Sequence, residues 1–344
     1  MKSIVLTDIR KMKIRETPKP QVKAGNDILL KIETVGICGS DVHYYSTGRI
    51  GDQIVKYPFT IGHECSASVM EVGSNVTHIK IGNRVAIEPA VSCWRCDQCL
   101  SGRPHTCRNL KFLGCPGQID GCLSEYLIMP EESCHKIPVE MSFEQAALIE
   151  PLSIGVYAVD FLNEKANSVA ILGSGPIGLS VLLTLKAAGI ENVYMTDKVD
   201  DRVKIAKKAG ACWSGNPDKT DIIAEIKQKE QGSLDTVFEC CGDQDALNQS
   251  IELLKSGGQL ILIGIPEHER IYFNIHKLRR KEISIQNVRR QNNCVRKAID
   301  LVHSGRIDTD FMITHRFNFE ETDKAFELVE NYRDGVIKAM VKVG

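Results

Sequence analysis

The sequence predicts an α/β protein in two parts, one built mostly of short β-strands and one a doubly wound parallel sheet. At 344 residues, the chain exceeds the length that one hydrophobic core usually serves. Up to about residue 150, short apolar runs are separated by Gly, Pro, Asn and Asp, which is typical of strands and turns. From about residue 154, apolar strands alternate with longer amphipathic helices, which indicates consecutive βαβ units.

Individual elements follow from the same patterns. In the first part, residues 28–32 and 66–72 are expected strands. In the second part, the expected strands are SVAILG, NVYMTD, DTVFECC and QLILIGI, and the expected helices are the segment ending at Ala188 and DRVKIAKKAG. Beyond them we expect helices near residues 295–303 and 320–331, followed by the strand KAMVKVG.

Charge and cysteine content narrow the class of function. The chain has 43 Lys and Arg against 44 Asp and Glu, a net charge of -1, which gives no electrostatic footprint for nucleic acid or an anionic membrane. No segment approaches the roughly 20 apolar residues that cross a bilayer, and the first residues lack the apolar core of a signal peptide. We therefore expect a cytoplasmic protein with a small-molecule partner. In that reducing compartment, 13 cysteines indicate metal binding or catalysis before disulfides.

A glycine-rich turn joins the strand SVAIL to the helix that follows it. It reads Gly173-Ser174-Gly175-Pro176-Ile177-Gly178. Such a turn lets backbone amides approach a pyrophosphate at a helix N-terminus. Asp197 ends the next strand, where a carboxylate can accept hydrogen bonds from both ribose hydroxyls. The sequence therefore predicts a site that prefers NAD over NADP, with Lys198 and Arg202 close enough to soften the preference; the alternative is a simple turn beside an ordinary surface aspartate.

Four cysteines lie close together in the first part of the chain. They are Cys93, Cys96, Cys99 and Cys107. Thiolates grouped this tightly on a loop can close a tetrahedral shell around zinc and leave no position for a substrate. We therefore predict a structural zinc site, with disulfides or incidental cysteines as the alternatives.

A second set of metal-ligand side chains is spread more widely. Its members lie in the segments Cys38-Gly39-Ser40-Asp41-x-His43, Gly62-His63-Glu64 and Glu150-Pro151. A thiolate, an imidazole and a carboxylate are a sufficient protein shell for a catalytic zinc that keeps one position for water or a substrate oxygen. Each residue taken singly also fits an ordinary structural role, Cys38 as a small buried hydrophobe and His63 as a core histidine.

The segments GICGSDVHYYSTGRIGD, YPFTIGHE, GNRVAIEPAVSCWRCDQC and ALIEPLSIGV resemble the zinc-containing medium-chain dehydrogenases, in particular their sorbitol, iditol and xylitol dehydrogenase branch. The resemblance covers essentially the whole chain. It implies an NAD-dependent zinc polyol dehydrogenase, similar to L-iditol 2-dehydrogenase, that oxidises a secondary hydroxyl to a ketose.

The resemblance also assigns roles to residues. Cys38, His63 and Glu64 match the catalytic zinc ligands, with water completing the shell, and Glu150 matches the carboxylate that contacts the metal through that water or replaces a ligand during turnover. Ser40 and His43 match a proton relay through the cofactor ribose, and the four clustered cysteines match a structural zinc lobe, which makes two zinc ions per chain. Arg289 matches an arginine of the substrate pocket, and Tyr44, Phe112 and Glu150 complete that pocket. Arg290 is the neighbour of Arg289 and a further candidate substrate contact.

The family fold explains why the first part of the sequence has a pattern of short strands and turns and the second part alternates strands with helices. By resemblance, a GroES-like catalytic domain comprises residues 1–154 and 289–344, and a Rossmann NAD-binding domain comprises the inserted residues 155–288. Cofactor and substrate are expected to meet in the cleft between these domains. The resemblance further implies a homodimer or homotetramer joined through the edges of the nucleotide-binding sheets.

The segment QNVRRQNNC departs from the branch at one position. Arg289 lies where the branch has an arginine that binds polyol hydroxyls, whereas Arg290 replaces an aromatic neighbour. Two adjacent guanidinium groups can bind a phosphate bidentately, so a phosphorylated polyol is an alternative substrate. A side chain of Arg290 that merely points to solvent is the other interpretation.

Two other classes of protein, a zinc-free reductase and a nucleotide sensor, would share only some of these motifs. A zinc-free reductase for quinones or enones would lack the set Cys38, His63 and Glu64, which this chain has. A zinc-binding nucleotide sensor without turnover would keep the glycine turn and the four cysteines but would need neither the open zinc site nor the relay. The expected zinc content is two ions per chain for the dehydrogenase, one for the sensor and none for the reductase.

Overall fold

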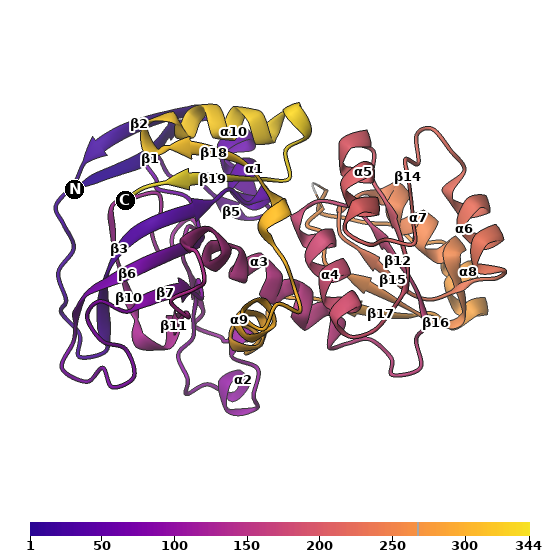
Figure 1. Ribbon diagram of the computed structural model, residues 1–344, viewed down its shortest axis with the longest axis horizontal. Coiled ribbons are helices and arrows are strands. Elements are labelled where there is room, and N and C mark those ends of the chain that lie inside the picture. Colours follow the sequence, from indigo (N-terminus) through magenta and orange to yellow (C-terminus); the bar gives the residue numbers. More distant parts are fainter. Residues whose placement is uncertain (267) are drawn as a thin grey trace. The chain divides into compact units, whose positions relative to one another are not determined.

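The computed structural model describes residues 1–266 and 268–344 and divides the chain into two compact units. Unit 1 comprises Met1–Glu150 and Val295–Gly344, and unit 2 comprises Pro151–Cys294 (Figure 1). The expected changes of domain were at 154/155 and 288/289, so unit 2 extends further at both ends. Helix α3 (Phe143–Val159) runs through the first change, and β17 (Ser284–Asn287), the last strand of the sheet of unit 2, ends just before the second.

Unit 1 is built around a seven-stranded sheet in the order β11-β7-β6-β3-β19-β18, with β10 pairing to β3. The strands of unit 1, including those of its small two-stranded sheets, are β1 (Lys2–Asp8), β2 (Lys11–Glu16), β3 (Asp27–Gly36), β4 (Arg49–Ile50), β5 (Gln53–Ile54), β6 (Glu64–Val72), β7 (Arg84–Ile87), β8 (Ala90–Val91), β9 (Lys111–Phe112), β10 (Tyr126–Pro130), β11 (Cys134–Lys136), β18 (Ile313–Asn318) and β19 (Lys338–Lys342). Its helices are α1 (Gly39–Thr47), α2 (Asp97–Leu100), the first half of α3, α9 (Val295–His303) and α10 (Thr322–Glu330), with short 3₁₀ turns at Pro104–Thr106, Glu131–Ser133, Asp310–Met312, Phe319–Glu321 and Arg333–Gly335.

Strand β3 organises this unit because it pairs on both sides. It runs antiparallel to β6 on one side and to β19 on the other, so a strand from the end of the chain lies beside strands from its beginning. The strand expected at residues 28–32 is part of β3, whose side chains at Ile28, Leu30 and Ile32 are fully buried. These strands close over a core that draws on both ends of the chain.

Unit 2 contains a six-stranded sheet in the order β14-β13-β12-β15-β16-β17, with every neighbouring pair parallel. Helices run along this sheet (Figure 1). The strands are β12 (Ser168–Leu172), β13 (Asn192–Thr196), β14 (Trp213–Gly215), β15 (Leu234–Glu239), β16 (Leu254–Leu262) and β17. The helices are α4 (Pro176–Ala187), α5 (Asp200–Lys208), α6 (Ile222–Glu230), α7 (Gln244–Leu253) and α8 (Ile275–Lys281).

The strand order of unit 2 reverses direction at β12, because β13 and β14 continue to one side and β15 to β17 to the other. Ligands of doubly wound sheets bind at such a switch point, outside the carboxyl ends of the strands. The α/β fold class is therefore confirmed, as is the helix expected at residues 295–303. Within the part of the chain that the structure describes, no helix is long and apolar enough to cross a membrane.

Candidate functional site

The first group of donor side chains is Cys38, His63 and Glu64, whose ligand atoms all lie within 4.8 Å of one another. Sheet pairing brings them together. Gly36 at the end of β3 pairs with Glu64 at the start of β6, so Cys38, two residues past β3, lies beside the two donors at the start of β6. His63 and Glu64 are buried, whereas Cys38 is half-buried.

Asp41 orients the imidazole of this group. The His63 ring nitrogen Nδ1 lies 3.2 Å from Asp41 Oδ1, and the same oxygen accepts the Gly62 N–H at 3.1 Å. Burial lowers the pKa of His63, but the charges of Asp41 and Cys38 outweigh burial and hold its pKa well above the usual value. An Nδ1–H that donates to Asp41 leaves Nε2 as the ligand atom, which is the arrangement commonly found around histidine ligands of metals.

Glu64 forms a buried ion pair that the sequence analysis did not predict. Lys338 Nζ, on β19, lies 2.8 and 2.6 Å from the two carboxylate oxygens of Glu64 and 3.1 Å from the Ile37 carbonyl. Both side chains are only 1% exposed. Burial alone would lower the pKa of Lys338, but the charges of Glu64, Cys38 and Glu150 raise it, so the lysine is a fixed cation among anionic groups.

The residues of the expected relay lie on the first turns of α1. The Ser40 hydroxyl donates to Cys38 Sγ at 3.3 Å, which places it directly beside the metal donors. His43 is three positions further along the same helix, so both side chains lie on one helix face. Glu150 is buried in α3, and its charge acts on Lys338, which places this carboxylate in the same electrostatic environment as Glu64.

Two of the expected substrate residues also belong to unit 1. The Phe112 ring packs at a tilt against the His63 ring, with centroids 5.3 Å apart. The buried Tyr44 hydroxyl donates to Gln53 Oε1 at 2.8 Å and lies 3.8 Å from Cys115 Sγ. Phe112 is therefore in contact with the donor group, and Tyr44 is held in a fixed position by its own partners.

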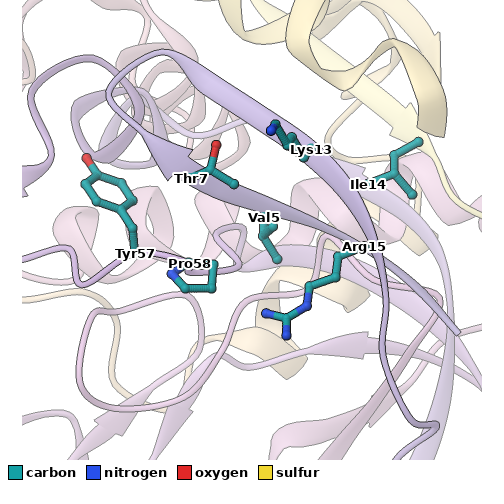
Figure 2. A pocket seen from close by; sticks show the side chains of 7 residues that line it. All are labelled: Val5, Thr7, Lys13, Ile14, Arg15, Tyr57 and Pro58. Carbon is teal, nitrogen blue, oxygen red and sulfur yellow. The ribbon is translucent and has the colours of Figure 1, made fainter.

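A shallow hollow elsewhere on unit 1 is lined by side chains that include no metal donor and no carboxylate. It has a volume of about 370 Å³ and lies between the β1–β2 hairpin and the Tyr57–Pro58 segment (Figure 2). Its lining consists of Val5, Thr7, Lys13, Ile14, Arg15, Tyr57 and Pro58. None of these side chains is a metal donor or a carboxylate, so the hollow is not a candidate catalytic site.

The second group of donors is the four-cysteine cluster, whose sulfur atoms also lie within 4.8 Å of one another. Cys107 Sγ accepts the backbone N–H groups of Cys93 at 3.2 Å and Asn109 at 3.3 Å. The backbone N–H of Arg95 lowers the pKa of Cys93 to about 6, which favours its thiolate form. The lobe is tied together by Arg108, which donates two hydrogen bonds to Asp97 at 2.5 and 2.8 Å.

Both donor sets fit zinc. The lobe offers four sulfur ligands, the shell of a closed structural site, and backbone N–H groups donate to the sulfur atom of Cys107. The other group offers sulfur, nitrogen and oxygen from three side chains, the number typical of a zinc site that keeps a position for a substrate. All thirteen cysteines are free thiols, so the disulfide alternative for the cluster is not what the structure shows.

The glycine-rich turn of unit 2 requires glycine at two of its positions. Gly173 has φ of +105°, a conformation that side chains disfavour. A Cβ at Gly178 would lie 1.9 Å from the Gly173 carbonyl oxygen, so only glycine permits this close approach of strand and helix. Gly175 is the N-cap of α4, and Pro176 at the first helical position has no N–H, so the backbone donors at the start of this helix begin with Ile177.

Asp197 follows β13 directly and is held by backbone donors. Its two carboxylate oxygens accept the N–H groups of Ser174 at 2.8 Å and Val199 at 2.9 Å, so the glycine turn and the end of β13 are joined through this side chain. The guanidinium of Arg202 lies over the same turn, 3.3 Å from where a Cβ at Gly175 would be. Lys198, expected to soften the preference for NAD, instead pairs with Asp243 at 2.9 Å.

Arg289 and Arg290 lie in unit 2, in the segment after β17. Arg289 is exposed, whereas Arg290 is half-buried, with a positive φ of 56° and an Nη1 atom shielded from solvent. The interpretation in which Arg290 merely points to solvent therefore does not describe its side chain.

Sequence reasoning missed two residues that contact the donor group of Cys38, His63 and Glu64, namely Asp41 and Lys338. Asp41 stands three positions after Cys38, and its carboxylate accepts the Cys38 N–H at 3.3 Å, a capping arrangement that the spacing could have indicated. Lys338 stands at the start of the apolar strand KAMVK, and a charged residue buried in such a strand requires a partner. Nothing local in the sequence indicates that the partner is Glu64.

Comparisons with known proteins agree with this geometry. Residues 24–139 match the model of the alcohol dehydrogenase GroES-like domain, and residues 176–304 match that of the zinc-binding dehydrogenases. The chain is 36% identical to a sorbitol dehydrogenase of Bacillus subtilis, over 99% of this chain and 97% of the relative. It is 35% identical to a sorbitol dehydrogenase of Arabidopsis thaliana, over 94% of this chain and 90% of the relative.

Solved structures of similar proteins contain both forms of the nicotinamide cofactor. An alcohol dehydrogenase of Escherichia coli CFT073, complexed with NADH, superposes with a TM-score of 0.90 at 30% identity and covers 100% of this chain and 99% of its own. A zinc-binding dehydrogenase of Sinorhizobium meliloti, bound to NADP, superposes with a TM-score of 0.89 at 30% identity and covers 99% of each chain. With its two donor groups and its glycine turn, the chain belongs to the zinc-containing medium-chain dehydrogenases.

Proposed function

We propose that this protein is a zinc- and NAD-dependent dehydrogenase that oxidises a secondary hydroxyl of a polyol of the sorbitol, iditol or xylitol type to the ketose. The observation that carries the proposal is the group of Cys38, His63 and Glu64, which brings three donors together within the described part of the chain and has its imidazole oriented by Asp41. The relatives named as sorbitol dehydrogenases support a polyol as the substrate.

In this proposal, Cys38, His63 and Glu64 hold the catalytic zinc, and Lys338 fixes the carboxylate of Glu64. When bound, zinc lowers the pKa of a substrate hydroxyl and NAD accepts a hydride. Ser40, whose hydroxyl lies beside Cys38 Sγ, accepts the substrate proton at Oγ, and His43 passes it to solvent. Glu150 adds a buried carboxylate that can hold water next to the donors.

Four residues are proposed to recognise the substrate. Phe112 and Tyr44 supply an aromatic wall and a fixed hydroxyl in unit 1. Arg289 and Arg290 supply guanidinium groups that donate to polyol hydroxyls. The relatives named above act on unphosphorylated polyols by name, so we favour these over phosphorylated ones and keep the phosphates as a test.

Coenzyme binding is proposed at the carboxyl ends of β12 and β13. The N–H groups of Gly175, Ile177 and Gly178, in the glycine-rich turn and at the start of α4, bind the pyrophosphate, and Asp197 accepts hydrogen bonds from the adenosine ribose. Because five of the thiols belong to the two donor groups, a reducing compartment such as the cytoplasm suits the protein, which cell fractionation would test.

The sheet edge at β17 is the proposed contact between subunits. In the sheet of unit 2, β17 is the last strand, and its Ile285 side chain is 38% exposed. Pairing of two such edges would cover unpaired backbone groups and this apolar side chain. We therefore propose a homodimer or a homotetramer assembled from such dimers, and sedimentation at micromolar concentration should give at least twice the mass of one chain.

The deciding experiment measures NADH formation with sorbitol, xylitol, iditol and galactitol and with their phosphates, together with the zinc content of the purified protein. We expect turnover with at least one free polyol and two zinc ions per chain. Faster turnover with a phosphate would favour the phosphorylated alternative. One zinc ion and no turnover would instead favour a nucleotide sensor, and either result would contradict the proposal.

A further inference from the structure

The carboxyl edge of unit 2 contains an ion pair that crosses the end of β12. Lys198 stands two residues after β13, and Asp243 stands four residues after β15, with Nζ and Oδ2 2.9 Å apart. Because β12 lies between β13 and β15 in the sheet, this pair joins the loops on either side of the glycine turn. A Cβ at Gly173 would lie 3.2 Å from both the Cys240 carbonyl carbon and Cys241 Cβ, so the turn and the loop after β15 are in close contact.

The position of Asp243 is fixed independently of Lys198. Asp243 is the N-cap of α7, and its other oxygen accepts the Asp245 N–H at 2.7 Å. The backbone of Lys198 is fixed as well, since its carbonyl accepts the Asn216 side-chain amide at 2.8 Å. The two charges therefore face each other from two anchored loops, although both side chains are partly exposed.

The electrostatic surroundings of Lys198 are acidic. The hydrogen bond with Asp243 raises the pKa of Lys198, and the charges of Asp218 and Asp245 act in the same direction. The same hydrogen bond lowers the pKa of Asp243. Lys198 is thus a cation whose charge is already balanced, directly next to Asp197 at the proposed ribose site.

We propose that Asp243 is a determinant of coenzyme specificity, because it holds Lys198, the cation directly after Asp197 that could pair with a 2′-phosphate. NADP carries a phosphate on the adenosine 2′-oxygen, and enzymes that bind NADP place a cation there. To reach that phosphate, Lys198 must leave Asp243, which then remains as an anion close to the phosphate. Asp197 repels the 2′-phosphate, and Asp243 withholds the lysine that would attract it.

This inference rests on the proposed function, in which NAD binds at the glycine turn, and it goes further by giving the preference a second residue. Homologues of the same fold have been solved with NADH and with NADP, so the fold itself does not decide between them. The preference for NAD or NADP therefore depends on side chains at this edge, such as Asp197, Lys198 and Asp243.

The test replaces Asp243 with asparagine. Asparagine remains a good N-cap, so α7 keeps its first turn while Lys198 loses its anion. Isothermal titration of the zinc-loaded protein with NADP should show about five- to tenfold tighter binding in Asp243→Asn than in the natural protein, with NAD affinity nearly unchanged. The matched control is Asp245→Asn, which removes the same charge from the same helix end but leaves Lys198 paired, and its NADP affinity should change less than twofold.

A double variant shows whether the effect acts through the lysine. In Asp243→Asn combined with Lys198→Met, the gain in NADP affinity should disappear. A gain that persists in the double variant, or an equal gain in Asp245→Asn, would overturn the inference, because either would reflect net charge alone. Unchanged NADP affinity in Asp243→Asn with normal NAD binding would overturn it while leaving the proposed function intact. If the natural protein bound neither coenzyme, both proposals would fall.

Discussion

Replacing Lys338 with methionine is expected to destabilise the metal-free protein by about 3–5 kcal/mol, because it leaves the carboxylate of Glu64 buried without its counter-ion. The pair is 1% exposed on both sides, so water cannot replace the ammonium. The surroundings cannot adapt by moving Glu64 toward β3, since the backbone of Gly36 already lies against its carboxylate. Urea unfolding, followed by circular dichroism after chelation of zinc, measures the effect.

Zinc addition, a double variant and a control variant test whether the loss of stability in Lys338→Met comes from the lone buried charge of Glu64. Zinc should reduce the loss of stability in Lys338→Met, because the ion supplies positive charge to the same carboxylate. The double variant Glu64→Gln with Lys338→Met should be more stable than Lys338→Met alone, since no lone buried charge remains. Lys324→Met, which breaks an exposed ion pair with Glu321 in the same unit, serves as control and should cost less than about 1 kcal/mol. Equal effects at Lys338 and Lys324 would contradict a structural role for the buried pair.

Replacing Cys38 with alanine is expected to reduce NADH formation on the order of a thousandfold or more, since a bound zinc contributes several kcal/mol to the reaction. The fold should survive, because Cys38 is half-buried and precedes α1 rather than filling the core. Zinc content should fall from two ions per chain to one. Elemental analysis, steady-state kinetics and circular dichroism on the same preparation give the three readouts.

The lobe offers a matched substitution. Cys99→Ala should also remove one zinc ion, but it should lower the thermal stability while the remaining protein still turns over substrate. The two variants together therefore separate the ion that serves the reaction from the ion that serves the fold. Full turnover in Cys38→Ala would refute the assignment of the catalytic group.

The sequence predicted more of unit 2 than of the metal group. Parallel strands and helices repeat there with a regular pattern, so local patterns such as SVAIL followed by a glycine turn predict the sheet and its binding edge. In unit 1, the identity of the donor residues Cys38, His63 and Glu64 could be predicted from their chemistry and from resemblance. Their geometry could not, because it depends on strand pairing between segments that are far apart in the chain.

The two missed contacts share one physical cause. Lys338 reaches Glu64, and Lys198 reaches Asp243, through the order of strands in a sheet. Neither pair has a fixed sequence spacing, so no motif indicates it. A charged side chain next to a predicted site can therefore have a partner that its position in the sequence does not indicate, as Lys198 has in Asp243.

The pairing of β19 with β3 determines when the metal group can be completed during synthesis. Unit 2 is translated after Glu64 and before Lys338, so a ribosome must finish the whole nucleotide-binding sheet before the counter-ion of Glu64 exists. Unit 2 is one continuous segment and can fold while it emerges from the ribosome. The sheet of unit 1, in contrast, lacks β18 and β19 until the end of the chain has been synthesised. Under the proposed function, stable zinc insertion at this centre is thus a late event in the life of each new polypeptide.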